Sequence, residues 1–446
     1  MERPVKWKEF FNKTMIVRFF VKPVFYPCLL LSFFLLSCAS TRYPRGGSVN
    51  VPDDFFGMVH AGHSQSHEEY ELLDDLGVKW VLTTLYWGSV ERHKGNFDFS
   101  RYDKYVETAK KEGKKIVIVL AYEAPWLYPD GESKKYISPE NIPHFLRFVE
   151  ETVKRYQGRV DVWNIWNEPN WKFWKGSKKD YYELSRRSAQ KIRETDPDAY
   201  ILGGGFLRVP KRFIKKMNRA GGMENLDGLA FHPYALHPEG SMRLHDKFTR
   251  VVSDINFTGE AWITEIGHPT GGRYPHKVSL EGLPSHVVKS MTGAAARGTR
   301  AALWYELFDH HNKNDVPPKT TDSEKFFGLV YPDFSRKNGA NAYELCAKFL
   351  PGSRYVPDFL QREKIPSSII SFCFLEGTSG NNTLVVWNDK KRTKKVKLYL
   401  DAPAVLYDVT TGKGQPLSAE TILEIGKQPQ MITWQGTHVP RLSTTK

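Results

Sequence analysis

Two glutamates occupy positions where a charged side chain is unexpected. Glu168 follows the apolar run Trp163-Asn164-Ile165-Trp166, and Glu265 follows Trp262-Ile263-Thr264. A carboxylate at the end of an apolar run is costly unless it is paired or does chemistry. Two carboxyl groups facing one pocket can cleave a glycosidic bond, one as a protonated acid and the other as a nucleophile or base. The alternative is that both are structural ion-pair partners on the rim of the fold.

The apolar pattern predicts which elements carry these glutamates. From residue 54, apolar β-branched runs alternate with longer stretches of helical period. The expected strands are Phe55–Val59, Trp80–Thr84, Ile116–Ala121, Val160–Trp166, Tyr200–Gly204, Gly228–Phe231, Ala261–Glu265 and Ala301–Trp304. The expected helices are Ser66–Leu76, Arg101–Glu112, Pro139–Tyr156, Asp180–Glu194, Pro210–Ala220, Met242–Val252, Ser285–Arg297 and Asn338–Leu350.

This alternation is typical of the α/β class and predicts a (β/α)8 TIM barrel over residues 54–351. Chemistry in such barrels lies at the C-terminal ends of the strands. Glu168 would end the fourth strand and Glu265 the seventh. A doubly wound open sheet is the alternative, but no GxGxxG follows the first strand, and Gly203-Gly204-Gly205 lacks that spacing.

The segment Asn167-Glu168-Pro169 resembles the Asn-Glu-Pro motif of clan A glycoside hydrolases, which are retaining (β/α)8 enzymes. The resemblance makes Glu168 the acid/base, Glu265 the nucleophile and Asn167 a ligand of the sugar 2-hydroxyl. It also implies that Tyr234, in Phe231-His232-Pro233-Tyr234, bonds the nucleophile and that His232 lies at the site. For Asn167 and Glu168 both to reach the pocket, the strand must end or bulge there, and Pro169 favours an extended Glu168.

Further segments resemble family 39 and its relatives, namely Phe56–His60, Thr84–Trp87 and the turn Gly95–Asp98. Trp304, at the end of the eighth strand, resembles the aromatic platform under the sugar at the cleaved bond. Asn167, His232, Tyr234 and Trp304 could instead be turn or core residues.

Histidines and aromatic residues near the strand ends add candidate substrate contacts. His60, His63 and His67 are spaced almost like zinc ligands, but a His60 that contacts substrate is the favoured interpretation. We expect no metal and no cofactor. Aromatic residues crowd the same loops, and we expect half of them, Trp126 among the candidates, to stack on sugar rings and half to be ordinary packing. The set is Trp87, Tyr122, Trp126, Trp171, Phe173, Trp174, Tyr305 and Phe308.

After Pro351 the pattern changes to short strands with turns between them, which predicts a small antiparallel β-sandwich-like module over residues 352–446. Its connection to the last helix is short, and Phe359, Leu360, Phe372 and Phe374 offer apolar surface. We therefore expect a module packed on the barrel rather than a tethered lectin. The expected strands are Ile369–Phe374, Thr383–Trp387, Lys395–Leu400, Ala404–Asp408, Thr421–Ile425 and Met431–Trp434.

The N-terminus has the features of a targeting segment. Basic residues precede an apolar run, Val24–Leu36, which ends in Leu35-Leu36-Ser37-Cys38 and resembles a bacterial lipobox. This predicts a signal peptide over residues 1–37, a lipidated Cys38, and a tether over residues 38–53. A plain anchor or a soluble secretory signal is the alternative, and Met15 is a second plausible start. We expect a monomer on the cell envelope, anchored to a bacterial membrane and facing the periplasm or the exterior.

Composition narrows the remaining function classes. The 446 residues carry 64 Lys and Arg against 50 Asp and Glu, but no nucleic-acid-binding motif accompanies this net charge of +14. Basic residues after both glutamates could favour an anionic glycan or could form a solvated face; they are Lys172, Lys175, Lys178, Lys179, Arg273, His276 and Lys277. Four cysteines exclude a disulfide scaffold, and Cys346 and Cys373 could pair or remain buried thiols.

These features together predict a retaining glycoside hydrolase that acts on a poly- or oligosaccharide. The alternatives are a non-catalytic glycan-binding surface lipoprotein and a transglycosylase that uses the same residues.

Overall fold

The computed structural model describes residues 47–444, apart from 129–132, 274–276, 312–321, 358, 401 and 437–439. The described residues belong to one compact unit. Eight parallel strands close a barrel in chain order, and β9 completes it by pairing with β2. The strands are β2 (Phe56–Val59), β3 (Trp80–Tyr86), β4 (Lys115–Ala121), β5 (Val162–Ile165), β6 (Tyr200–Leu207), β7 (Gly228–His232), β8 (Glu260–Ile266) and β9 (Ala302–Trp304). The expected TIM barrel is confirmed.

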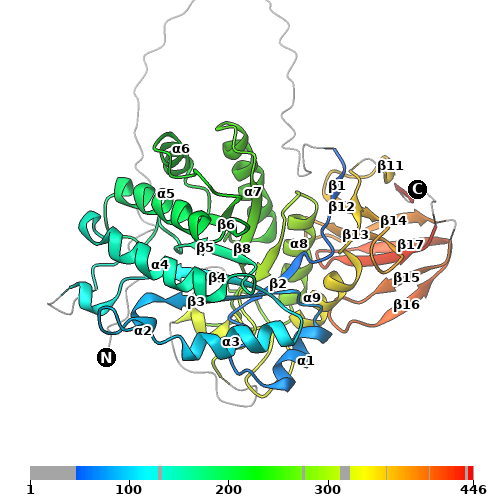
Figure 1. Cartoon of the computed structure of the whole chain (residues 1–446). Helices are drawn as coiled ribbons and strands as arrows, with labels where there is room; N and C mark the ends of the chain where they lie inside the picture. Colours follow the sequence, from blue (N-terminus) through cyan, green and yellow to red (C-terminus); the bar gives the residue numbers. More distant parts are fainter. Residues whose placement is uncertain are drawn as a thin grey trace, which may run out of the picture. The chain divides into compact units, whose positions relative to one another are not determined.

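Helices follow the strands and surround the barrel (Figure 1). They are α1 (His67–Asp75), α2 (Trp87–Val90), α3 (Ser100–Lys111), α4 (Ile142–Tyr156), α5 (Lys178–Thr195), α6 (Lys211–Arg219), α7 (Pro238–Ser253), α8 (Leu283–Ala295) and α9 (Asn338–Phe349). None of the helices in this described part is long and apolar enough to cross a membrane.

Helix α4 illustrates how sequence period selects the buried face. Phe145, Val149 and Val153 recur every four residues and are fully buried, whereas the intervening Arg147 and Glu151 are not. An apolar stripe with this period packs against the barrel while the opposite face meets water. Helix starts carry the expected signals, since the Ser66 hydroxyl accepts the Glu69 N–H at 3.2 Å.

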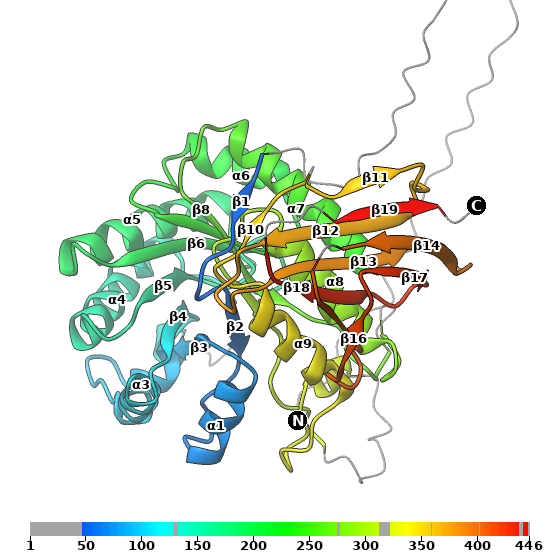
Figure 2. The same cartoon turned by 90° about the vertical axis from the view of Figure 1, so that its right-hand side faces the viewer.

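The chain after α9, together with β1 from before the barrel, forms two sheets. The larger has seven strands in the order β1-β10-β12-β13-β18-β15-β16, and the smaller has four in the order β11-β19-β14-β17. Figure 2 shows both beside α8 and α9. The bounds are β1 (Val49–Asn50), β10 (Arg354–Tyr355), β11 (Gln361–Glu363), β12 (Ile369–Leu375), β13 (Asn382–Asn388), β14 (Lys394–Tyr399), β15 (Ala404–Tyr407), β16 (Gly414–Leu417), β17 (Glu420–Ile425), β18 (Gln430–Trp434) and β19 (Arg441–Thr444).

The central strands β12 and β13 of the seven-stranded sheet are buried on both faces, which explains the unbroken apolar run of β12. Side chains alternate along a strand. Ile369, Cys373 and Leu375 join the core between the two sheets, whereas Phe372 and Phe374 join the barrel core. The expected apolar docking surface therefore holds for these two phenylalanines, whereas Phe359 and Leu360 pack between the sheets.

Polar contacts reinforce the junction between barrel and sheets. Lys289 of α8 lies over the Trp387 ring at 5.4 Å, and Phe349 of α9 contacts the Tyr407 ring at 4.9 Å. Asn341 donates to the Thr410 carbonyl at 2.9 Å. The boundary between the barrel and the C-terminal module, expected between residues 351 and 352, stays a prediction.

The N-terminal expectations fall mostly outside the described residues, including residues 1–37 and Cys38. The last part of the expected tether is described: β1 pairs with β10, so Val49 and Asn50 are already part of the larger sheet. Cys346 and Cys373 are buried free thiols and do not pair.

Candidate active site

Glu168 and Glu265 meet at the C-terminal end of the barrel. Strand β5 ends at Ile165, and Glu265 is the penultimate residue of β8. Carboxylate oxygens of the two glutamates and a ring nitrogen of His232 all lie within 4.8 Å of one another. Strand β5 therefore ends before Asn167, as is needed for both Asn167 and Glu168 to reach the pocket.

The backbone at Glu168 differs from the expected extended geometry. Its φ is +44°, in the left-handed region, and Trp166 is also left-handed at +68°. The Glu168 N–H donates to the Gly205 carbonyl at 3.0 Å, which ties the turn after β5 to β6. The expectation from Pro169 was wrong because this tertiary turn outweighs the local preference of a residue before proline.

His232 connects the two carboxyl groups. Its Nδ1 lies 2.9 Å from Glu168 Oε1 and 3.4 Å from Glu265 Oε2, and its Nε2 lies 3.0 Å from Thr264 Oγ1. Burial lowers the pKa of His232 against the opposing charge of Glu265, so the neutral ring is favoured. A neutral ring that donates from Nε2 to Thr264 can accept at Nδ1 the proton of a protonated Glu168.

Burial raises the pKa of both glutamates. Desolvation brings the pKa of Glu168 to about 8, with Lys172 opposing and Glu324 adding to the rise. Desolvation brings the pKa of Glu265 to about 7, lowered by His232 and raised by Glu168. Two carboxyl groups this close disfavour double ionisation, which suits one acid and one carboxylate at neutral pH.

Tyr234 and Asn167 are the next two candidates. The Tyr234 O–H donates to Glu265 Oε2 at 3.2 Å, as the resemblance implied. Asn167 Nδ2 donates to the Tyr122 hydroxyl at 3.3 Å, and its side chain is partly exposed. Both side chains therefore reach the site.

His60 also reaches the site. Its Nδ1 lies 2.8 Å from Glu306 Oε2, and His310 Nε2 lies 3.4 Å from the other oxygen of the same carboxylate. His67 is instead exposed and pairs with Glu71. The three histidines of the zinc-like spacing thus do not converge.

The only grouping of three or more His, Cys, Asp or Glu ligands found among the described residues is Glu168, His232 and Glu265. In this grouping Nδ1 of His232 and Oε1 of Glu168 already bond each other.

Trp304 is not placed as a platform. Its side chain is fully buried, and its ring faces His268, which contacts His286 of α8. A ring without exposed surface cannot stack on a sugar, so this assignment is corrected. The next residue, Tyr305, is partly exposed, lies 5.3 Å from the His60 ring, and donates its O–H to Glu324 at 3.0 Å.

Trp126 is partly exposed and contacts neighbouring elements, and its role in binding substrate stays a prediction. Its Nε1 donates to the Glu91 carbonyl at 2.9 Å, and its ring contacts Trp87 and His144. It therefore packs against α2 and α4. It does not line the pocket that opens over the ends of β3 and β4.

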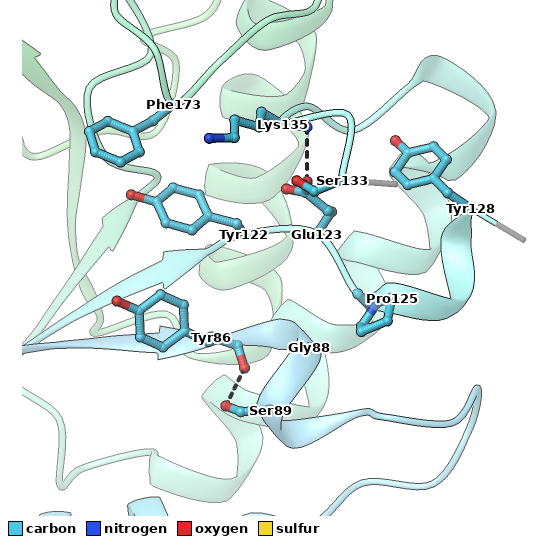
Figure 3. A pocket seen from close by; sticks show the side chains of 11 residues that line it. Tyr86, Gly88, Ser89, Tyr122, Glu123, Pro125, Tyr128, Ser133, Lys135 and Phe173 are labelled. Carbon is cyan, nitrogen blue, oxygen red and sulfur yellow. Dashed lines mark hydrogen bonds between the residues drawn. The ribbon is translucent and has the colours of Figure 1, made fainter. Parts of the chain in front are cut away.

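That neighbouring pocket, of about 440 Å³, opens over the ends of β3 and β4 (Figure 3). Tyr122 and Phe173 are stacked at 5.7 Å, and Tyr86 is 45% exposed. The Tyr122 hydroxyl joins the pocket to Asn167 and hence to the glutamates. Phe173 and Tyr122 are thus well-placed aromatic candidates, whereas Trp87 and Trp174 are buried packing residues.

The sequence interpretation missed three residues with a direct bearing on the site: Tyr86, Glu306 and Glu324. Tyr86 ends β3, and Glu306 lies two residues after the end of β9. The strand-end rule that found the glutamates could have found Tyr86 and Glu306. Glu324 lies on the short helix Ser323–Phe326, far from any strand end, and no local signal marks it.

Comparisons with known proteins bear on the fold and on the class of enzyme. Residues 48–256 match the family model described as cellulase (glycosyl hydrolase family 5). No curated protein sequence matches the chain.

Solved structures share the fold. A family 39 glycoside hydrolase from the gut symbiont Bacteroides cellulosilyticus WH2 matches at 21% identity over 86% of this chain and 81% of that chain, with a TM-score of 0.72. A monomeric β-xylosidase from Caulobacter crescentus CB15 matches at 14% identity over 88% and 98%, with a TM-score of 0.61. The family 30 subfamily 8 xylanase Xyn30A from Clostridium acetobutylicum matches at 10% identity over 87% and 96%, with a TM-score of 0.59.

At these identities the solved structures establish the fold alone. Together with the family match over the part of the barrel from β2 to β7, they make the chain a glycosidase with the clan A glycoside hydrolase fold.

Proposed function

We propose that the chain is a retaining glycoside hydrolase that cleaves O-glycosidic bonds of a poly- or oligosaccharide by double displacement. The observation that carries this proposal is the proximity of Glu168 and Glu265, whose carboxylate oxygens lie within 4.8 Å at the active end of the barrel. Retaining enzymes hold their carboxyl groups about 5–5.5 Å apart, whereas inverting enzymes need about 6.5–9.5 Å to admit a water.

The surroundings of each carboxyl support its role. Glu265 accepts the Tyr234 O–H, which favours its ionised form, and the charge of His60 favours that form as well. It is therefore assigned as the nucleophile. Glu168 is buried, has the more strongly raised pKa, and can give its proton to or take it from a group in the cleft. It is therefore assigned as the acid/base.

The reaction follows in two steps. A Glu265 oxygen bonds the anomeric carbon as the glycosidic C–O bond breaks, and the leaving oxygen takes the proton of Glu168. Water then gives a proton to the Glu168 carboxylate while its oxygen bonds the anomeric carbon, which releases Glu265. His232 and Tyr234 orient the two carboxyl groups, and Asn167 is placed to bond a ring hydroxyl.

A covalent trap tests the assignment. A panel of 2-fluoro glycosides with good leaving groups should label wild-type protein at a peptide containing Glu265, because the fluorine slows hydrolysis of the ester. The Glu265→Ala variant should remain unlabelled. A label on another residue, or products whose anomeric configuration is inverted, would contradict the mechanism. Product analysis with an added sugar acceptor separates hydrolysis from transglycosylation.

We also propose that the enzyme is held at the cell envelope by lipid on Cys38, with carbohydrate and membrane as its partners and a monomeric state. The support is the lipobox-like sequence before Cys38. Metabolic labelling with a fatty-acid probe should mark wild type and Cys28→Ala, the matched control inside the apolar run, but not Cys38→Ala. Label persisting on Cys38→Ala would refute the anchor.

A further inference from the structure

A second pocket opens on the catalytic face, on the other side of Tyr86. It measures about 310 Å³, at the low end for a small-molecule site, and so suits one ring-sized group. It lies at the ends of β2 and β3, between the start of α3 and the loop after β9. Its lining is His60, His63, Thr83, Thr84, Tyr86, Arg101, Glu306, Phe308 and His310.

This pocket adjoins the glutamate pair. The His60 ring lies 5.3 Å from the ring of Tyr305. The charges of His60 and Glu265 act on each other: Glu265 raises the pKa of His60, and His60 lowers that of Glu265. A substituent of a sugar bound at Glu265 therefore lies within reach of the pocket.

Cations outnumber carboxylates in the lining. Arg101 is exposed, and no described carboxylate lies within ion-pair distance of its guanidinium. The side chains of His60 and His310 are 39% and 52% exposed. Glu306 is the single carboxylate; only 4% of its side chain is exposed, and both oxygens face the two imidazoles. Its carboxylate is thus paired with His60 and His310, whose exposed sides line the pocket.

Glu306 favours the protonated form of both His60 and His310. The hydrogen bond to Glu306 raises the pKa of His310 against the effect of burial. Burial disfavours the charged form of His60, but Glu306 outweighs it and raises the pKa of His60. Burial, with the charges of His60 and Arg101, lowers the pKa of His63 to about 4. His63 therefore stays neutral beside positive neighbours.

We propose that this pocket binds an anionic substituent of the glycan, a carboxylate or a sulfate ester on a sugar ring, through Arg101, His60 and His310. The proposal rests on the glycosidase function proposed above and names its substrate class as acidic glycans. Arg101 supplies a permanent charge and a planar fork that fits a two-oxygen anion. The aromatic pocket of Figure 3 would then take a neutral ring face on the other side of Tyr86.

Matched polymers test the charge requirement without changing linkage. Native glucuronoxylan is compared with its carboxyl-reduced form, and a sulfated galactan with its desulfated form. Hydrolysis is measured with wild type, Arg101→Gln, His310→Gln and the control Arg250→Gln, an exposed arginine in the last turn of α7. Binding of the same polymers is measured with full-length Glu265→Ala alone and combined with Arg101→Gln.

We expect wild type to prefer one acidic form over its neutralised form, and Arg101→Gln to lower that ratio by roughly ten- to a hundredfold, because hydrogen bonds to charged groups are among the strongest. His310→Gln should lower it less, and Arg250→Gln should keep it. The carboxylate and sulfate arms identify which anion is bound.

Equal use of acidic and neutralised polymers, or a preference that survives Arg101→Gln, would overturn the proposal. If none of these polymers is cleaved, they are not substrates, and the 2-fluoro glycoside trap tests the hydrolase function separately. The anion site then stands only if Glu265→Ala binds an acidic polymer better than its neutralised form and Arg101→Gln removes the difference. Absence of such binding overturns it.

Discussion

Replacing Glu168 with glutamine should stabilise the folded protein, and the gain should grow with pH. Burial raises the pKa of Glu168 from 4.5 to about 8. Between these values the folded state holds a proton that the unfolded state has lost. The wild-type free energy of unfolding therefore falls as pH rises through this window. Glutamine stays neutral and keeps a polar group beside His232, so the variant escapes this loss.

The size of the effect follows from the same two values. One carboxyl with pKa 4.5 unfolded and about 8 folded destabilises the protein by about 1 kcal/mol at pH 5 and about 4 kcal/mol at pH 7.5. The stability difference between Glu168→Gln and wild type should thus widen by about 3 kcal/mol across this interval.

Urea unfolding at pH 5 and pH 7.5 measures this difference. The matched control is Glu151→Gln, because Glu151 is exposed on α4 and its neutralisation should have the same small effect at both pH values. If Glu168→Gln changes stability equally at both pH values, Glu168 is already ionised in the folded protein at neutral pH. It could not then serve as the acid, and the reasoning from burial would be wrong.

Three further predictions concern the nucleophile, its hydrogen-bond donor and the C-terminal sheets. Glu265→Ala should remain folded and lose nearly all turnover, on the order of 10⁴-fold or more; azide should restore cleavage with inverted product, and unchanged activity would end the assignment. Tyr234→Phe removes a donor to the Glu265 carboxylate, so the acidic limb of the pH profile of kcat/KM should move up by about one unit; a limb that does not move, or moves down, would separate Tyr234 from the nucleophile. Truncation after Gly352 should lower the Tm and the solubility, because the barrel surface beneath Phe372, Phe374 and Trp387 becomes exposed; a soluble truncate of unchanged Tm would contradict the packed arrangement.

The barrel could be predicted from the sequence because each strand is a short apolar run that is followed by a stretch of helical periodicity. Strands β3 and β4, for example, begin within one residue of their expected starts. The short strands β10, β11 and β16 could not be read this way. Arg354–Tyr355, Gln361–Glu363 and Gly414–Leu417 are polar or very short, and their extended form depends on neighbours elsewhere in the chain.

Site residues could be predicted where their position at the end of a strand was enough to place them. They could not be predicted where the direction of the side chain decided whether it reaches the site. Glu168, His232 and Glu265 converge because their strands end at one face of the barrel. Trp304 and Tyr305 are neighbours with opposite directions. The pairing of β8 with β9 shifts register between Ile263 and Ile266, so counting along the sequence could not tell which ring faces the site.

The pairing of β1 with β10 has a consequence for the order in which the molecule assembles. Val49 lies opposite Tyr355, and Phe56 of β2 lies opposite Ala302, so β1 finds its partner, and β2 the second of its two partners, only in the last third of the chain. Such distant pairing is slow and leaves open strand edges until it is complete. The nascent chain must therefore keep its early strands from pairing wrongly until its last third has emerged. Shortening the chain at its C-terminus would therefore leave early strands unpaired as well as remove late ones.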